Sequence, residues 1–309
     1  MAENKLVIGS RGSKLALWQA NHIAGRLRER HVGLEVRIEV IKTKGDKILD
    51  VSLSKIGGKG LFTKELEEAI LRRDVDLAVH SLKDLPTEVP DGLEAGIITL
   101  RSHGADALLC RGHAGLDSLP AEAVIGTSSL RRKVQLAALR PDLTFKDLRG
   151  NVDTRIRKLE EGQYDAIVLA QAGMERLGLQ DKITELLNPN IILPAAGQGA
   201  LALEYRRGDE RTFDLLSFLD HELTRHEAGA ERQFLGRLGG GCQVPIGAHA
   251  VTRDDGSLLL KGMVSDLDGD IIMKGEIVGT PGGTAGVELA ESMLEDGAQE
   301  IVAEIYKEK

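Results

Sequence analysis

Aromatic side chains are scarce in this chain of 309 residues, which has one Trp, three Tyr and five Phe. So few rings cannot form the row of stacking surfaces on which single-stranded nucleic acid is bound. The chain is also acidic, with 40 Lys and Arg against 48 Asp and Glu and an isoelectric point near 5.6. This balance argues against non-specific binding to a polyanion, and we expect no nucleic-acid partner.

Long apolar runs and cysteines are scarce as well. No run approaches the roughly 18–20 apolar residues of a membrane helix, and the apolar run at 6–8 is too short for the core of a signal peptide. The two cysteines, Cys110 and Cys242, make no disulfide framework and leave too few thiols for a zinc site. We therefore expect a cytoplasmic protein with no membrane partner and no metal.

The charges are unevenly distributed along the chain. Residues 251–309 contain five Lys or Arg and thirteen Asp or Glu, whereas residues 1–250 contain 35 of each sign. Within that balanced part, residues 125–160 contain nine basic and four acidic residues. A concentrated basic segment in an acidic protein fits a small anionic ligand better than a long polyanion.

Strand patterns alternate with helix patterns through most of the first 200 residues. The predicted strands are 6–8, 34–40, 75–79, 107–110, 124–126, 144–148, 166–169 and 201–203, the last returning to the first block. The predicted helices are 16–27, 61–72, 129–139, 152–161 and 171–177. Repeated strand–helix–strand units imply right-handed crossovers and a largely parallel sheet.

The last part of the chain has a different pattern. A helix at about 220–238 precedes strands at 246–252, 258–264 and 271–279, and a helix at 284–305 follows. The Asp- and Gly-rich turns between these strands predict antiparallel hairpins. We therefore predict three domains: two α/β domains around a cleft, at 1–99 with 200–217 and at 105–193, and an α+β domain at 222–309 with a three-stranded antiparallel sheet.

Basic and hydroxyl side chains recur where a predicted strand gives way to a helix. They are Arg11 and Ser13 in GSRGS at 9–13, Ser129, Arg131 and Arg132 in GTSSLRR at 126–132, and Arg149 and Arg155 in LRGNVDTR at 148–155. Helix N-termini and arginines both bind anions. A plain helix cap explains the first turn equally well, and a solvated helix face is the alternative for the others. Two such turns in one block favour a site for several carboxylates or phosphates.

The segment HSLKDLP at 80–86 follows a predicted strand directly. Lys83 can pair with an anion, and Asp84 can stabilise a cation or transfer a proton. An ordinary Lys–Asp ion pair in a loop is the alternative. The segment 42–60, with five lysines and four glycines, fits either a lid over an anionic substrate or a plain loop.

Cys242 follows three glycines, which remove side-chain cover from its thiol. An exposed thiol on such a loop is a candidate nucleophile or covalent attachment point. No His partner is evident nearby, which weakens a Cys–His hydrolase interpretation. Cys110 lies in an apolar strand and is explained as a buried side chain.

Seven segments, in the same order, resemble the porphobilinogen deaminase (hydroxymethylbilane synthase) family across nearly the whole chain. They are 9–13, the lid with Lys55 and Lys59, 80–86, 126–132, 148–155, PAAGQGAL at 194–201 and GGCQVPIG at 240–247. Around 101–106 the chain departs from the family pattern. Only Arg101 and Asp106 look familiar there, so no hinge ion pair is predicted.

The resemblance implies two α/β domains like those of periplasmic binding proteins, and a transferase of porphyrin and heme biosynthesis. Such an enzyme joins four porphobilinogen molecules head to tail on a covalent dipyrromethane cofactor, releases ammonia, and then frees hydroxymethylbilane by hydrolysis. Cys242 would hold the cofactor through a thioether, and Asp84 would be the catalytic residue. Porphobilinogen would be the small-molecule partner of a monomeric protein.

The resemblance also assigns the remaining site residues. The implied cofactor-binding residues are Cys242, Lys83, Asp84, Ser129, Arg131, Arg132, Arg149 and Gly150. The implied substrate-binding residues are Arg11, Ser13, Phe62, Arg149, Arg155, Arg176 and Gln198, with Lys55 and Lys59 in the lid. A non-catalytic anion-binding module of the solute-binding-protein type is the alternative function, because two α/β domains around a cleft describe such proteins too. It leaves the glycine-flanked Cys242 unexplained.

Overall fold

The computed structural model of the chain describes residues 4–47, 60, 62–241 and 243–307. These residues form two compact units. The first unit takes its described residues from 4–47, 60, 62–102 and 200–225, and the second takes them from 103–199 and 226–307. Within the described ranges, no helix is both long enough and apolar enough to cross a membrane.

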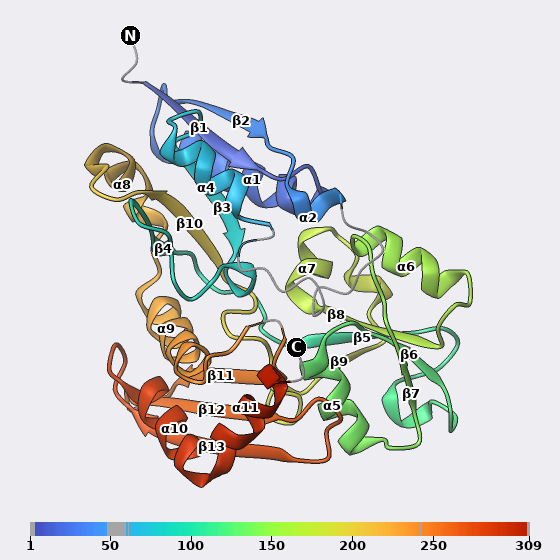
Figure 1. Cartoon of the computed structure of the whole chain (residues 1–309). Helices are drawn as coiled ribbons and strands as arrows, with labels where there is room; N and C mark the ends of the chain where they lie inside the picture. The colour runs from blue at the N-terminus through green and yellow to red at the C-terminus, as the bar shows by residue number, and fades with distance from the viewer. Residues whose placement is uncertain (1–3, 48–59, 61, 242, 308–309) are drawn as a thin grey trace. The chain divides into compact units, whose positions relative to one another are not determined.

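The first unit is built on a five-stranded sheet with the strand order β2-β1-β3-β10-β4 (Figure 1). The strands are β1 (Lys5–Ser10), β2 (Glu35–Val40), β3 (Leu77–Ser81), β4 (Leu93–Ile98) and β10 (Leu201–Arg206). The helical segments are α1 (Lys14–Arg30), α2 (Lys44–Lys47), α4 (Lys64–Leu71), η1 (Leu82–Asp84), α8 (Glu210–Leu216) and η4 (Ser217–Leu219). Helices α1 and α8 share an apolar core on one face of the sheet, and α4 packs on the other. Helix α1 presents Ala20, Ile23, Ala24 and Leu27 to that core at helical spacing.

The second unit contains a sheet of the same design, ordered β7-β6-β8-β5-β9. Its strands are β5 (Asp106–Cys110), β6 (Val124–Gly126), β7 (Thr144–Lys146), β8 (Ala166–Ala170) and β9 (Glu185–Leu187). Its helical segments are α5 (Leu130–Leu139), α6 (Val152–Glu160), α7 (Gln171–Arg176), η2 (Leu116–Ser118) and η3 (Gln180–Lys182). Helix α5 covers one face, and α6 and α7 cover the other.

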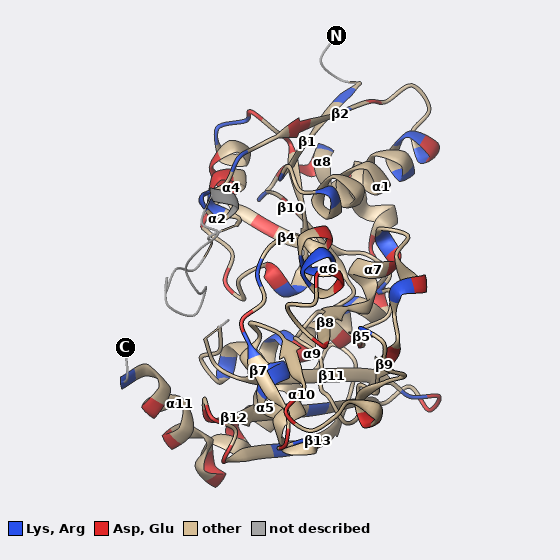
Figure 2. Ribbon diagram, turned by 90° about the vertical axis from the view of Figure 1, so that its right-hand side faces the viewer, with Lys and Arg blue, Asp and Glu red and all other residues tan. Residues whose placement is uncertain are grey.

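The C-terminal part of the second unit is an antiparallel sheet of β11 (Ile246–Thr252), β12 (Leu258–Ser265) and β13 (Ile272–Gly279). Helix α9 (Glu222–Arg237) precedes the sheet, and α10 (Ala285–Met293), η5 (Leu294–Ala298) and α11 (Gln299–Lys307) follow it. Their apolar faces form one core with the sheet. Much of the excess of acidic residues in 251–309 lies on α10, η5 and α11. Figure 2 marks Asp and Glu in red along α11.

The predicted fold class is confirmed, with one correction to the sheets. Each five-stranded sheet is mixed rather than largely parallel: β10 is antiparallel to β3 and β4, and β5 is antiparallel to β8 and β9. The chain reaches β5 from the first unit and β10 from the second. Neither strand therefore arrives by a helical crossover within its own sheet, and the crossover rule does not set its direction.

Several elements differ from the sequence prediction. The helix expected at 284–305 is interrupted at Gly297, whose φ of 115° lies in the left-handed region that favours glycine. Strands β4 and β9 and helix α8 were not predicted. The return of 201–203 to the first sheet, as β10, is confirmed.

Candidate active site

A small pocket of about 60 Å³ lies in the first unit at the carboxyl ends of β1 and β3, beside the N-terminal ends of α1 and α4. Ligands of open α/β sheets bind at this edge. The pocket brings together four predicted site residues, which are Arg11, Ser13, Phe62 and Asp84. Segments far apart in sequence thus supply one site.

Arg11 and Ser13 are both held in place by local contacts. The Arg11 guanidinium lies 4.1 Å from the centre of the Phe62 ring, a cation–π contact that orients its planar donors. The Ser13 hydroxyl accepts a hydrogen bond of 3.2 Å from the Ala16 backbone N–H and so caps α1. The helix-cap interpretation of Ser13 is therefore confirmed, and anion binding at this turn stays a prediction.

Asp84 presents an exposed carboxylate to this pocket. It ends the short turn η1, directly after Lys83. Among the described residues it forms no hydrogen bond or ion pair, so the ordinary Lys83–Asp84 pair considered from the sequence is not formed. A pocket carboxylate that no described residue pairs with is available to a cationic or N–H-bearing ligand.

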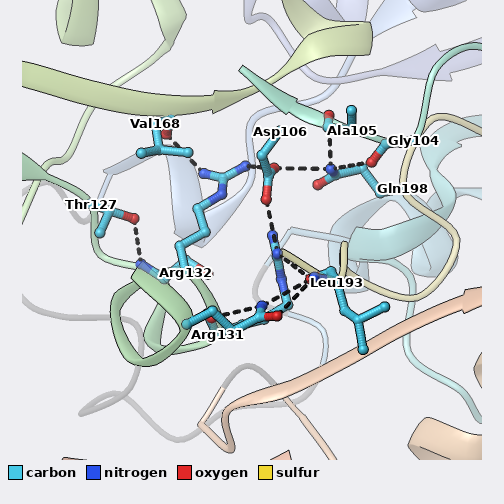
Figure 3. A network of polar contacts seen from close by, with 11 residues as sticks. Gly104, Ala105, Asp106, Thr127, Arg131, Arg132, Val168, Leu193 and Gln198 are labelled. Atoms are coloured by element: carbon cyan, nitrogen blue, oxygen red, sulfur yellow. Dashed lines mark hydrogen bonds and ion pairs between the residues drawn. The ribbon is translucent and has the colours of Figure 1, made fainter. Parts of the chain in front are cut away.

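In the second unit a buried cluster surrounds Asp106, the first residue of β5 (Figure 3). Its two carboxylate oxygens are shared between two arginines: Oδ2 lies 2.8 Å from Arg131 Nη1, and Oδ1 lies 2.6 Å from Arg132 Nη2. Burial alone would raise the pKa of Asp106, but the two guanidinium groups hold that pKa well below its usual range. The carboxylate is therefore ionised inside the protein.

Arg131 and Arg132 are themselves buried, with 5% and 6% of their surfaces exposed. Arg131 also donates to the Leu193 carbonyl at 2.7 Å, and Arg132 donates to the Val168 carbonyl at 2.9 Å. Burial lowers the pKa of Arg131, while Asp106 acts in the opposite direction. For these two arginines the alternative of a solvated helix face is wrong. Their role in holding cofactor carboxylates stays a prediction.

The turn that follows β7 carries Arg149 and Gly150, and Arg155 lies in the first turns of the next helix, α6. Gly150 has φ 112°, and a Cβ there would lie 2.6 Å from Thr154 Cγ2, so only glycine fits without a shift. Its carbonyl accepts a hydrogen bond of 2.7 Å from Arg155 Nε. The Nε of Arg149 is buried without a hydrogen-bond partner in the described part of the chain. Figure 2 marks Lys and Arg in blue along the following helix, α6.

Two further predicted substrate ligands form hydrogen bonds that hold the loop at 194–199 in place. Arg176 Nη2 donates to the Gly199 carbonyl at 2.6 Å, and burial lowers the pKa of Arg176 to about 10, so it remains charged at neutral pH. The buried Gln198 side chain donates to the Gly104 carbonyl at 2.7 Å and to Asp106 Oδ1 at 2.9 Å. Gln198 is thus part of the Asp106 cluster (Figure 3).

Asp106, the partner of two predicted ligands, was not placed in the site from the sequence, because no ion pair was predicted around 101–106. The available indication was a carboxylate at the start of an otherwise apolar strand, DALLC. A buried charge requires a partner of opposite sign. Arg131 and Arg132, 25 and 26 residues away, were predicted as cofactor ligands and not as partners of Asp106.

The remaining predicted residues have limited or no structural description. Ser129 is the N-cap residue of α5, without a side-chain cap bond. Lys55, Lys59 and Cys242 lie outside the described residues, so the lid and the attachment point stay predictions. Across the described ranges, no three His, Cys, Asp or Glu side chains are grouped so as to hold a metal ion.

Two family models match the chain. Residues 6–214 match the porphobilinogen deaminase dipyrromethane cofactor-binding domain, and residues 226–295 match the porphobilinogen deaminase C-terminal domain. This chain belongs to the porphobilinogen deaminase family. The members of this family are transferases. The larger of the two matched domains, at 6–214, is the cofactor-binding domain.

Named members of the porphobilinogen deaminase family align over nearly the full chain. The porphobilinogen deaminase of Nitratidesulfovibrio vulgaris is 53% identical, covering 98% of this chain and 97% of that protein. That of Geobacter metallireducens is 50% identical, covering 99% and 96%. Among solved structures, a periplasmic VFT2 domain of Bordetella pertussis BvgS is 14% identical with a TM-score of 0.42, covering 69% of this chain and 86% of that one. The last match is too distant to bear on the chemistry.

Proposed function

We propose that this chain is a hydroxymethylbilane synthase. It would join four porphobilinogen molecules head to tail, release ammonia at each addition, and free hydroxymethylbilane by hydrolysis. The observation that carries this proposal is the Asp84 carboxylate, which has no partner among the described residues and lines one pocket together with Arg11. Porphobilinogen combines carboxylates with a pyrrole N–H and an aminomethyl group, and these two side chains complement both parts.

The second unit offers the donors that a dipyrromethane cofactor requires. Each pyrrole ring of that cofactor carries two carboxylates, and arginine binds a carboxylate through a planar pair of donors. The buried Nε atoms of Arg132 and Arg149 have no hydrogen-bond partner among the described residues, so both side chains retain unused donors. The proposed ligands in this unit are Ser129, Arg131, Arg132, Arg149 and Gly150, with the thioether bond at Cys242. Lys83 and Asp84 in the first unit stay predicted cofactor ligands.

When bound, the cofactor supplies an anchored pyrrole from which the product chain starts. Asp84 then stabilises the positive charge that develops on the substrate as ammonia leaves, because a carboxylate that faces the developing charge offsets it electrostatically. The same carboxylate can accept a pyrrole proton. The substrate carboxylates would be held by Arg11, Ser13, Arg149, Arg155 and Arg176, with Phe62 and Gln198 completing the predicted set.

Incubation of the purified protein with porphobilinogen tests the proposal directly. The expected result is loss of porphobilinogen with one ammonia released for each molecule consumed. A protein that binds porphobilinogen but leaves it intact would instead be the anion-binding module, an alternative that rests on fold similarity alone. The monomeric state and the cytoplasmic location stay predictions.

A further inference from the structure

Glu231 lies in the interior of the second unit, and both oxygens of its carboxylate accept backbone hydrogen bonds. Oε2 accepts from the Gly197 N–H at 2.7 Å, and Oε1 accepts from the Ala250 N–H at 2.9 Å. The side chain is completely buried. It therefore joins three segments: helix α9, strand β11 and the loop at 194–199.

The loop at 194–199 connects Glu231 with the Asp106 cluster. Gly197 directly precedes Gln198, whose side chain donates to Asp106 Oδ1. At the other end of the same segment, the Leu193 carbonyl accepts from Arg131 (Figure 3), and the Pro194 carbonyl accepts from the Ala248 N–H of β11 at 2.9 Å. Residues 193–198 are thus hydrogen-bonded to β11 through Pro194 and to the Asp106 cluster through Leu193 and Gln198.

We propose that Glu231 is a positioning residue that acts through Gly197 and Gln198 to fix Asp106, and with it Arg131 and Arg132, relative to α9. This inference rests on the proposed function for its consequence, because these arginines are the proposed carboxylate ligands. Helix α9 leads along the chain to the glycines that precede Cys242. Glu231 thereby links the segment that bears the attachment residue to the groups that bind the attached molecule.

The chain contains a matched control for this inference. Glu227 lies one turn earlier on α9 and also accepts a backbone N–H of β11, that of Thr252, at 2.9 Å. No hydrogen bond or ion pair joins Glu227 to the 193–199 segment among the described residues. Both glutamates tie the helix to the sheet, and Glu231 alone of the two reaches Gly197.

The experiment compares Glu231→Gln with Glu227→Gln in the full-length protein. Glutamine keeps one acceptor oxygen and turns an N–H₂ donor toward the second N–H, so Glu231→Gln loses one of the two backbone hydrogen bonds described above. It also removes the negative charge that lies 3.8 Å from His249 Nδ1. By hydrogen–deuterium exchange, we expect Glu231→Gln to accelerate exchange in peptides covering 104–107 and 193–199, while Glu227→Gln does not. We also expect KM for porphobilinogen to rise about tenfold or more in Glu231→Gln, with a smaller change in kcat, because sub-ångström placement of binding groups is lost.

Equal effects of the two variants on exchange and on KM would overturn the inference, since Glu231 would then only tie α9 to β11. If Glu231→Gln fails to fold, Gln198→Ala breaks the same link from its other end. Unchanged exchange at 104–107 in that variant would count equally against the inference. If the wild-type protein leaves porphobilinogen intact, the proposed function fails, and the exchange measurement still decides whether Glu231 is coupled to Asp106.

Discussion

Asp106 and Arg132 form an ion pair in the interior of the second unit, with Oδ1 2.6 Å from Nη2 and both side chains almost fully buried. The other oxygen of Asp106 is taken by Arg131. One carboxylate therefore orients two guanidinium groups that were predicted to bind carboxylates of the cofactor. Groups fixed in this way bind a ligand without first losing side-chain freedom.

The Asp106→Asn variant should be strongly destabilised. The amide keeps the shape of the side chain but leaves two buried guanidinium groups without their counter-charge. Breaking a buried ion pair from one side costs about 3–5 kcal/mol. Urea unfolding at pH 7 measures the loss, and a free energy of unfolding equal to that of the wild type would contradict the account.

The same pair predicts a dependence of stability on pH. The folded-state pKa of Asp106 is lowered relative to the unfolded value of about 3.9. Its contribution to stability is thus fully present above that unfolded value and is lost as pH falls through the folded-state pKa. The difference between wild type and Asp106→Asn should shrink in strong acid. A difference that stays constant down to the acid limit of folding would argue against an ionised Asp106.

The Asp84→Ala variant should fold normally and lose nearly all turnover of porphobilinogen. Asp84 is exposed and has no partner among the described residues, so stability does not depend on it, whereas the cationic reaction stage does. Cofactor assembly should also be disturbed, since the same chemistry builds the cofactor. Asp91→Ala, another exposed aspartate of the first unit, is the control and should keep full activity. Turnover at the wild-type rate in Asp84→Ala would remove Asp84 from the mechanism.

The Arg149→Leu variant should weaken substrate binding more than it affects folding. The buried Nε of Arg149 has no protein partner in the described chain, and a hydrogen bond to a charged group is worth about 1.5–3 kcal/mol. KM for porphobilinogen should therefore rise by roughly ten- to a hundredfold. Arg157→Leu removes an exposed arginine from the same turn-to-helix segment and should leave KM unchanged. Equal KM values in the two variants would contradict a binding role for Arg149.

Glu67 on α4 should make the first unit less stable as pH rises. Burial raises its pKa, and the nearby Glu204 carboxylate adds to that shift. Because the folded-state pKa lies above the unfolded value, the stabilising contribution of the protonated form is lost as pH rises through the folded-state pKa. Glu67→Gln should remove this loss and raise Tm at neutral pH. Parallel Tm profiles for wild type and variant between pH 5 and 8 would show that Glu67 does not titrate in this way.

The strand-to-helix turns of the site were predictable from sequence because they depend on local features. The Gly and Ser residues at 9–13 and the arginines at 126–132 indicate the end of a strand from the local sequence alone, without knowledge of the tertiary fold. The pairing of Asp106 with Arg131 and Arg132 was not predictable in this way. It depends on β5 and β6 flanking β8 in one sheet, a tertiary arrangement that local patterns do not contain. The antiparallel entry of β5 and β10 was missed for the same reason.

The two cysteines allow the most direct test of the proposed chemistry. Burial raises the pKa of the Cys110 thiol to about 11, so Cys110 is almost entirely protonated at neutral pH and is a poor nucleophile. Cys110→Ser is therefore the matched control for Cys242→Ser. The intact mass of each purified protein is the measurement. We predict that wild type and Cys110→Ser exceed their sequence masses by one dipyrromethane and that Cys242→Ser carries none. An active wild-type protein of unmodified mass, or a modification that persists in Cys242→Ser, would contradict it.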